Sequence, residues 1–224
     1  MNMNTNLNQM SFQTAQQAFE TLYDKIIEEG VDTKLGTKAI YNCGFYIENP
    51  SERQILTPWR KWSAKYAERE WEWYLSKNRS VEDIKKYAPI WDCMHGGDNI
   101  VNSNYGWQWS RNGQLDKIIE QLKAHRYTRQ AWISIYDGKE KDDYAFDTPC
   151  TIAIGFHVDT VDDTKLNMTV IMRSNDLVFG FCNDQYCFSM LQQMVCERLD
   201  LKMGTYYHFA HDMHIYERHF NMKK

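Results

Sequence analysis

Apolar residues recur along this chain with two different spacings, which predict helices and strands. Spacings of three and four residues predict helices at residues 14–29, 59–77, 114–125 and 184–199. Runs rich in β-branched and aromatic residues predict strands at residues 38–48, 129–136, 151–158, 166–173 and 205–216. Residues 159–164 have turn composition, so the third and fourth of these strands should form a hairpin. Helices and strands are interspersed without strict alternation, which favours an α+β domain with a mixed sheet.

Length and charge narrow the class of protein. With 224 residues, of which 43% are hydrophobic, the chain can form one well-buried domain over residues 1–224, and we expect residues 1–10 to be flexible. The net charge of −4 argues against a nucleic-acid-binding protein, which usually carries a basic surface. The sequence has no signal-peptide pattern and no apolar stretch of membrane-spanning length. We therefore expect a cytoplasmic protein that does not contact membranes.

The chain contains six cysteines. They show no regular spacing and no C-x-x-C pair, so reduced thiols are a better interpretation than a disulfide framework or a zinc site.

Glu70 is the titratable residue that helix geometry singles out. In the predicted helix 59–77, Trp62, Tyr66, Glu70 and Trp73 fall on one face at 100° per residue. A carboxylate within an aromatic stripe is costly to ionise, so its pKa should be raised and it could act as a general acid or base. Alternatively, Glu70 lies at the edge of the stripe and pairs with a lysine or arginine. Helix geometry alone leaves both possibilities open.

Four further candidates stand at the ends of predicted elements. Cys150 follows Pro149 where a strand begins, and a cysteine there is more often a buried apolar residue than a nucleophile. Arg173 ends the paired strand, where it could lower the pKa of the Cys150 thiol, and with Ser174 it could bind a phosphate. The alternative for Arg173 is a surface ion pair. Asp184 stands where a helix should begin, so it could simply be the N-cap.

Two other stretches are less informative. His208, His211 and His214 invite a metal-binding interpretation, but residues three apart on a strand point to opposite faces. These imidazoles cannot easily converge on one ion, and we expect no metal site. Residues 102–109 form a polar and aromatic turn that could line a pocket or pack as an ordinary loop.

Taken together, short stretches over residues 31–220 resemble the thymidylate synthase superfamily. In chain order they are Arg69-Glu-Trp-Glu-Trp-Tyr74, Pro89-Ile-Trp91, Asn104-Tyr-Gly-Trp-Gln-Trp109, Thr128-Arg129, Pro149-Cys150, Arg173-Ser-Asn-Asp176, Gly180 and Asp212-Met-His-Ile-Tyr216. Residues 102–107, 172–176 and 178–184 are most similar to the phage-type deoxycytidylate hydroxymethylases of this superfamily. The resemblance implies a mixed, twisted sheet flanked by helices, with two sheets packed back to back in a homodimer.

The resemblance also implies a reaction on a nucleoside monophosphate. Cys150 would add to carbon 6 of the pyrimidine, and carbon 5 would then attack the one-carbon unit of methylenetetrahydrofolate. Glu70 would manage proton transfers through ordered water, and Asp184 would recognise the base. The other implied binding residues are Arg173, Ser174 and, from the second subunit, Arg129 for the phosphate; His214 and Tyr216 for the sugar; Tyr105, Asn183 and Lys34 for the substrate; and Trp91, Asp176 and Gly180 for the folate.

Asp184 separates the branches of the superfamily. Thymidylate synthases resemble one another in having an asparagine here, whose amide can match the oxygen and N–H of uracil. A carboxylate is better suited to accept a hydrogen bond from the exocyclic amine of cytosine, and such a site can reject the wrong partner by as much as ~10⁴-fold. Asn183 is adjacent, so a shift of one residue would restore an asparagine. The ungapped count from Arg173 through Gly180 favours Asp184.

Two departures from the family pattern complete the sequence-based hypothesis. Gln130 replaces the second arginine after Arg129, and the family's longer C-terminal tail has no counterpart after Phe220. By resemblance, a missing lid would favour capture of the intermediate by water over reduction. We therefore expect a homodimer that hydroxymethylates a cytidine monophosphate, in the first place dCMP. The alternatives are a methyltransferase acting on dUMP or dCMP, a CMP hydroxymethylase, and a catalytically inactive nucleotide-binding homologue.

Overall fold

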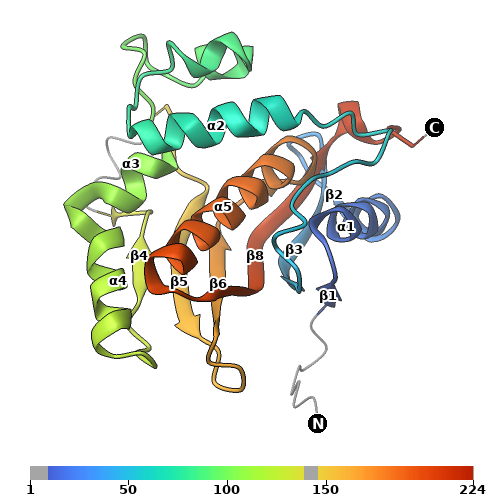
Figure 1. Cartoon of the computed structure of the whole chain (residues 1–224). Helices are drawn as coiled ribbons and strands as arrows, with labels where there is room; N and C mark the ends of the chain where they lie inside the picture. Colours follow the sequence, from blue (N-terminus) through green and yellow to red (C-terminus); the bar gives the residue numbers. More distant parts are fainter. Residues whose placement is uncertain (1–9, 139–145, 224) are drawn as a thin grey trace.

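The computed structural model describes residues 10–138 and 146–223 (Figure 1). Residues 1–9, most of the segment expected to be flexible, lie outside this range, whereas Met10 begins the first strand. The strands are β1 Met10–Phe12, β2 Val31–Asp32, β3 Thr37–Ile47, β4 Trp132–Ser134, β5 Thr151–Val158, β6 Lys165–Met172, β7 Asn175–Asp176 and β8 Lys202–Tyr216.

The strands form one mixed sheet, as predicted. Its order is β1-β3-β8-β6-β5-β4, with β2 paired to β3 and β7 paired to β8. The pairs β3–β8 and β5–β6 are antiparallel, and β6–β8 is parallel. The predicted hairpin is the β5–β6 pair, in which Thr151 lies opposite Met172. The first residues of β5 therefore lie beside the last residues of β6.

Helices gather on one face of this sheet. Figure 1 shows α5 crossing in front of the sheet with α2 running above it, and α5 contacts α1, α2, α4, β6 and β8. The α-helices are α1 Ala15–Glu29, α2 Ala64–Ser76, α3 Tyr105–Ser110, α4 Gln114–Ala124 and α5 Cys182–Leu199. Short 3₁₀ helices are η1 Ile84–Lys86, η2 Pro89–Cys93, η3 Arg111–Gly113 and η6 Glu217–His219, and η5 Leu177–Phe181 is π-helical. Within the described part of the chain, no helix is long and apolar enough to cross a membrane.

The core lies between α5 and the sheet. On β3, Phe45 and Ile47 are fully buried, whereas Tyr46 between them is only half-buried, because successive residues of a strand point to opposite faces. Phe181 packs on Phe45 with ring centroids 5.6 Å apart, and Leu191 of α5 is also fully buried. Burial of each such side chain contributes roughly 1.5–3 kcal/mol, which fixes α5 and η5 against the strands.

Two predicted elements begin later than their apolar pattern suggested. The helix predicted from residue 59 begins at Ala64, because Lys61 has a left-handed backbone (φ 50°) and Ser63 is the N-cap. The strand predicted over residues 129–136 is confined to β4, because the Gln130 N–H is hydrogen-bonded to Thr128 Oγ1 in a local turn. Apolar composition does not register these local hydrogen bonds.

The prediction of a turn over residues 102–109 was wrong, because helix α3 begins at Tyr105. Asn104 is the N-cap of α3, and its Oδ1 accepts from the Trp107 N–H over 2.8 Å. The same side chain donates to the carbonyls of Trp73 and Asn78, so α3 is fixed against the end of α2.

Candidate active site

Cys150 and Arg173 are neighbours at the end of the β5–β6 hairpin. The backbone N–H of Arg173 donates to the Cys150 carbonyl over 2.8 Å. The guanidinium donates to the carbonyls of Thr148 and Pro149, and one of its nitrogens lies 3.6 Å from Cys150 Sγ. The arginine therefore presents its charge to the thiol, and the alternative of a surface ion pair does not describe its contacts.

Arg173 affects the Cys150 pKa in the expected direction, but burial outweighs it. Burial raises the pKa of this thiol to about 11, and the charges of Asp184 and Asp147 add to the rise. Arg173 acts in the opposite direction, but its effect is smaller than that of burial. The guanidinium would help most when negative charge develops on Sγ during attack, since a nearby positive charge stabilises a thiolate.

Glu70 is buried, as the aromatic stripe predicted. Its Oε1 accepts hydrogen bonds from Tyr66 Oη at 3.1 Å and Tyr74 Oη at 3.4 Å, so its partners are tyrosines rather than a lysine or arginine. Its Oε2 is buried and makes no hydrogen bond within the described residues. Burial and the nearby charge of Asp184 raise the pKa of Glu70 to about 8, so the group can carry or release a proton near neutral pH.

Asp184 lies in the first turn of α5, but it is not the N-cap, which is Phe181. Its Oδ2 accepts a 2.8 Å hydrogen bond from Nδ2 of Asn175 on β7. Burial raises the pKa of Asp184 to about 7, and Asn175 opposes that rise. A carboxyl group that is held by one amide and affects the pKa of both Glu70 and Cys150 belongs to the same site as they do.

Asn183 points away from that site. Its Oδ1 accepts from Trp62 Nε1 at 2.9 Å, and its Nδ2 donates to the Phe179 carbonyl at 2.8 Å. Both the oxygen and the nitrogen of this amide therefore already have hydrogen-bond partners. It is the charge of Asp184, the next residue, that affects the pKa of Glu70 and Cys150.

The β7–β8 pair brings further predicted residues to this edge. Asp176 lies opposite His214 in the parallel register, and Ser174 immediately precedes β7. Asp176 accepts from the N–H groups of Val178 and Phe179, so its carboxylate caps η5. Nδ1 of His214 lies 3.0 Å from Asp212 Oδ1.

Tyr216 and Lys34 lie together at the end of β8. Tyr216 is 38% exposed, and the neighbouring Glu217 N–H donates to the Gly36 carbonyl in the turn between β2 and β3. Lys34 is an exposed residue of that turn.

Trp91 lies close to Glu70, and Tyr105 lies close to Cys150. Trp91 Nε1 donates to Tyr66 Oη at 3.0 Å, and the same tyrosine donates to Glu70. Tyr105 is buried, and its hydroxyl accepts from the Thr151 N–H, next to Cys150, at 3.3 Å. Trp91 therefore reaches Glu70 through one tyrosine, and Tyr105 lies at the base of the strand that presents the thiol.

Arg129 is not brought to this site within one chain. It is exposed and precedes β4, whose residue Trp132 lies opposite Gly155 of β5. Continuing that antiparallel register sends Arg129 toward the end of β5 that is distant from Cys150. That register places Arg129 level with Val158, so at about 3.4 Å per residue it lies about 27 Å from Cys150.

The three histidines of β8 have separate partners. His208 is buried, with Tyr206 and Asn175 beside its two nitrogens, whereas His211 contacts Asn42. Among the described residues, no group of three or more histidines, cysteines or acidic residues could hold a metal ion.

Sequence reasoning missed Asn175 and Asp147. Asp147 is buried and accepts from the N–H groups of Asn102 and Ser103 at 2.7 and 2.6 Å, which anchors the turn before Cys150. Asn175 lies between two residues that the sequence did single out. Both act through contacts with distant segments, so no local spacing could have revealed them.

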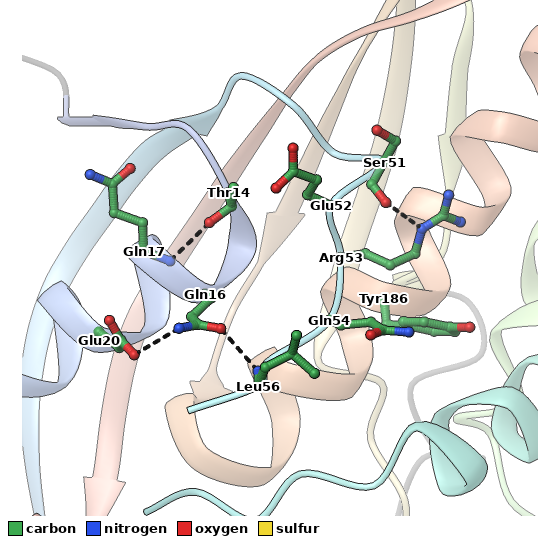
Figure 2. Close-up of a pocket in the computed structure, with 10 residues that line it drawn as sticks. All are labelled: Thr14, Gln16, Gln17, Glu20, Ser51, Glu52, Arg53, Gln54, Leu56 and Tyr186. Carbon is green, nitrogen blue, oxygen red and sulfur yellow. Dashed lines mark hydrogen bonds between the residues drawn. The ribbon is translucent and has the colours of Figure 1, made fainter. Parts of the chain in front are cut away.

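A groove of about 600 Å³ lies elsewhere (Figure 2). It runs between the start of α1 and residues 51–56, and its lining includes Gln16, Glu20, Arg53 and Tyr186. Tyr186 lies two residues after Asp184 on α5, a rotation of about 200°, so the two side chains point to opposite sides of the helix. The groove is therefore separate from the candidate active site.

Comparisons with known proteins agree with this geometry. The family model described as thymidylate synthase matches residues 17–224. The chain belongs to the thymidylate synthase family. It is 35% identical to the deoxycytidylate 5-hydroxymethyltransferase of Enterobacteria phage T4 over 175 residues, which cover 69% of this chain and 68% of that protein.

Thymidylate synthases are similar to nearly the same degree. That of Bacillus licheniformis is 28% identical over 229 residues, covering 91% of this chain and 80% of its own. The solved structure of the thermostable thymidylate synthase A from Bacillus subtilis superposes with a TM-score of 0.76 at 25% identity, covering 93% of this chain and 84% of that one. The protein is thus a thymidylate synthase-like one-carbon transferase, in a family that binds nucleoside monophosphates and uses methylenetetrahydrofolate as co-substrate.

Proposed function

We propose that this protein hydroxymethylates carbon 5 of the cytosine of a cytidine monophosphate, in the first place dCMP. The observation that carries the proposal is the carboxyl group of Asp184, which shares its site with Cys150 and Glu70. A carboxylate accepts hydrogen bonds and has no donor, so it suits the exocyclic amine of cytosine and not the carbonyl oxygen of uracil. The contacts of Asn183 support this assignment, because they direct that amide elsewhere.

The remaining side chains have roles that follow from their positions. The Cys150 sulfur adds to carbon 6, and the Arg173 guanidinium stabilises the developing thiolate and, with Ser174, binds the phosphate. Glu70 exchanges protons with the base through ordered water, with Tyr66 and Tyr74 fixing its carboxyl group. Methylenetetrahydrofolate would deliver its one-carbon unit to carbon 5 and leave as tetrahydrofolate, and carbon 5 would lose its proton. Water would then add to the exocyclic carbon as the Cys150 sulfur is released from carbon 6, which leaves a hydroxymethyl group on carbon 5.

Methylenetetrahydrofolate supplies the one-carbon unit at the oxidation level of formaldehyde. The residues present are compatible with it, because the indole of Trp91 offers a surface on which a flat pterin can stack. Asp176 accepts two backbone hydrogen bonds but, with about four lone-pair positions, can accept from a pterin N–H as well. Gly180 would keep this wall of the site free of side chains.

We further propose a homodimer formed by the sheet face opposite the helices. Tyr46 and Tyr207 lie on that face, with ring centroids 4.8 Å apart, and Trp132 is 45% exposed. Aromatic side chains of this kind are typical of the buried part of an interface. Such a dimer would allow Arg129 of each chain to reach the phosphate site of the other.

Replacement of Asp184 by asparagine tests the choice of base. Asp184→Asn substitutes an amide that matches uracil, so the ratio of kcat/KM for dCMP over dUMP should fall by about 100-fold or more, as expected when a specific hydrogen-bond pattern is broken. Asn183→Asp is the matched control and should leave the ratio within about threefold of wild type. Unchanged discrimination in Asp184→Asn would refute the proposed base recognition.

A catalytically inactive nucleotide-binding homologue is the alternative from another class of protein. Exchange of the carbon 5 hydrogen of dCMP with solvent distinguishes the two, because exchange requires addition of the nucleophile. We expect exchange in the wild type, none in Cys150→Ser, and normal exchange in Cys182→Ser, whose thiol is buried against the Leu177 carbonyl. Binding of dCMP without exchange would favour the inactive homologue.

A further inference from the structure

A chain of three buried polar side chains ends on Asp184. Tyr206 Oη lies 2.8 Å from His208 Nδ1, and His208 Nε2 lies 3.1 Å from Asn175 Oδ1. Asn175 Nδ2 then donates to Asp184 Oδ2 over 2.8 Å. Tyr206 and His208 are both fully buried and Asn175 is 3% exposed, so bulk water does not compete for these bonds. The chain links β8 and β7 to the first turn of α5.

The donor and the acceptor of each hydrogen bond in the series from Tyr206 to Asp184 follow from its geometry. The Asn175 nitrogen must face Asp184, because the amide oxygen cannot donate to a carboxylate. The Asn175 oxygen therefore faces His208 and can only accept, so Nε2 of His208 carries the hydrogen. In the neutral imidazole Nδ1 is then an acceptor and takes the hydrogen of the Tyr206 hydroxyl. Burial lowers the pKa of His208 to about 3, which keeps the ring in this neutral form.

His208 cannot easily change this arrangement. Phe45 stacks on its ring with centroids 5.3 Å apart, and the Phe181 ring meets it edge-on at 5.2 Å. A fixed imidazole donor prevents the Asn175 amide from turning its oxygen toward Asp184. The carboxyl group thus always meets an N–H donor on Oδ2.

Asp184 needs such a donor, because its other surroundings disfavour negative charge. Burial raises its pKa most, and Asp176, which caps η5, raises it further. The titratable groups coupled to it from the elements around it are Glu70 and Tyr74 of α2, Tyr105 of α3, Cys150 before β5, Cys182 and Cys187 of α5, and Tyr206 of β8. These groups are acidic or neutral, and Asn175 is the neighbour that opposes the rise.

We propose that Asn175, oriented by His208 and Tyr206, is a positioning residue that holds Asp184 as a hydrogen-bond acceptor and so sets the preference for an amino over a keto pyrimidine. The inference rests on the proposed function, since it deepens the role of Asp184 in base recognition. None of the three residues needs to touch the nucleotide. A purely structural role in the core would instead affect only the stability of the fold.

Three graded substitutions separate these roles. Asn175→Leu removes the donor, His208→Phe releases the amide, and Tyr206→Phe deletes one hydroxyl while keeping the ring. Each should lower the ratio of kcat/KM for dCMP over dUMP, by about tenfold for the first two and less for Tyr206→Phe, as the loss of one hydrogen bond to a charged group implies. Each should also move the acid limb of the dCMP profile to higher pH, because Asn175 lowers the pKa of Asp184.

Phe19→Leu is the matched control. Phe19 is fully buried and packs on Tyr23 and Trp59, away from His208, so its replacement should lower the melting temperature but keep the dCMP preference and the acid limb of the wild type. If all four variants lose stability and none changes the preference or the pH profile, the proposal is wrong and these hydrogen bonds only stabilise the fold. If Asn175→Leu does not fold, Tyr206→Phe, the mildest change, decides the matter.

A readout without substrate separates this proposal from the proposed function. The carboxyl carbon of Asp184 can be titrated by ¹³C NMR in the unliganded protein and assigned by its absence from Asp184→Asn. We expect its pKa to rise in His208→Phe and Tyr206→Phe and to stay constant in Phe19→Leu. An unchanged Asp184 titration in the first two variants overturns the positioning role. If the Asp184 pKa rises in these variants but the wild-type protein does not prefer dCMP, the positioning role is supported and the proposed function is refuted instead.

Discussion

At the scale of single residues, the site is defined by two carboxyl groups that are buried near each other. The pKa of Glu70 is raised to about 8 and that of Asp184 to about 7, in each case chiefly by burial. Their supports differ, because Glu70 is held by two tyrosine hydroxyls and Asp184 by an amide. Two carboxyl groups with different surroundings can divide the work, one moving protons and the other recognising the base.

Burial of Glu70 predicts a pH-dependent gain in stability for Glu70→Gln. The folded-state pKa lies above the ordinary value of 4.5, so the wild type loses stability as pH rises from about 4.5 to about 8. Glutamine has no charge to bury, so the melting temperature of the variant relative to wild type should increase over this interval, by about 2–4 °C per kcal/mol. Glu72→Gln, at an exposed position of the same helix, is the control. If the melting temperatures of wild type and Glu70→Gln change with pH in the same way, the account is contradicted.

At the scale of elements, the turn from β7 through η5 into α5 positions Asp184. Gly180 in this turn lies against the Asn175–Asp184 hydrogen bond, because a Cβ there would lie 2.7 Å from Asn175 Nδ2 and 3.2 Å from Asp184 Oδ2. Glycine is thus required by close approach of side chains rather than by its own backbone angles.

Gly180→Ala should therefore disturb base recognition. The added methyl must displace the Asn175 amide or the Asp184 carboxylate, which we expect to cost about 1–3 kcal/mol of stability and to lower the dCMP preference. Chemical denaturation and competition kinetics with dCMP and dUMP measure the two effects. Gly138→Ala is the control, since a Cβ at Gly138 meets no atom of residues 10–138 or 146–223 within 4 Å. A Gly180→Ala protein with wild-type stability and preference would show that the hydrogen bond tolerates the methyl group.

Much of this arrangement was predictable from sequence. There is a physical reason why the rest was not. Apolar periodicity located the β5–β6 hairpin and hence the Cys150–Arg173 pair, and it placed Glu70 on a buried face. It did not find His208 or Asn175 as partners, because their hydrogen bonds join segments more than 30 residues apart. The start of α2 at Ala64 depends on the Ser63 cap and the Lys61 backbone, which apolar spacing does not register.

At the scale of the whole molecule, the position of Arg129 argues for a shared active site. It lies beyond the end of the β4–β5 pair that is distant from Cys150, so one chain cannot bring both to one phosphate. If two chains pack sheet to sheet, the arginine of one can reach the site of the other.

Mixed dimers test this arrangement. Cys150→Ser and Arg129→Ala should each reduce activity strongly as homodimers, while unfolding and refolding the two together should restore about a quarter of wild-type activity, because half of the dimers have one complete site. Cys150→Ser mixed with Glu70→Gln is the control, since both residues come from the same chain and no complete site can form. Failure of the first mixture to exceed the Arg129→Ala homodimer would exclude the shared site.

The most direct test of the central claim is the mass of the product. The wild-type protein is incubated with equal amounts of dCMP and dUMP plus methylenetetrahydrofolate, and the nucleotides are analysed by mass spectrometry. We predict that dCMP is converted to a product heavier by one CH₂O unit while dUMP is unchanged. A product heavier by only CH₂, or consumption of dUMP in place of dCMP, would contradict the proposed hydroxymethylation of cytosine.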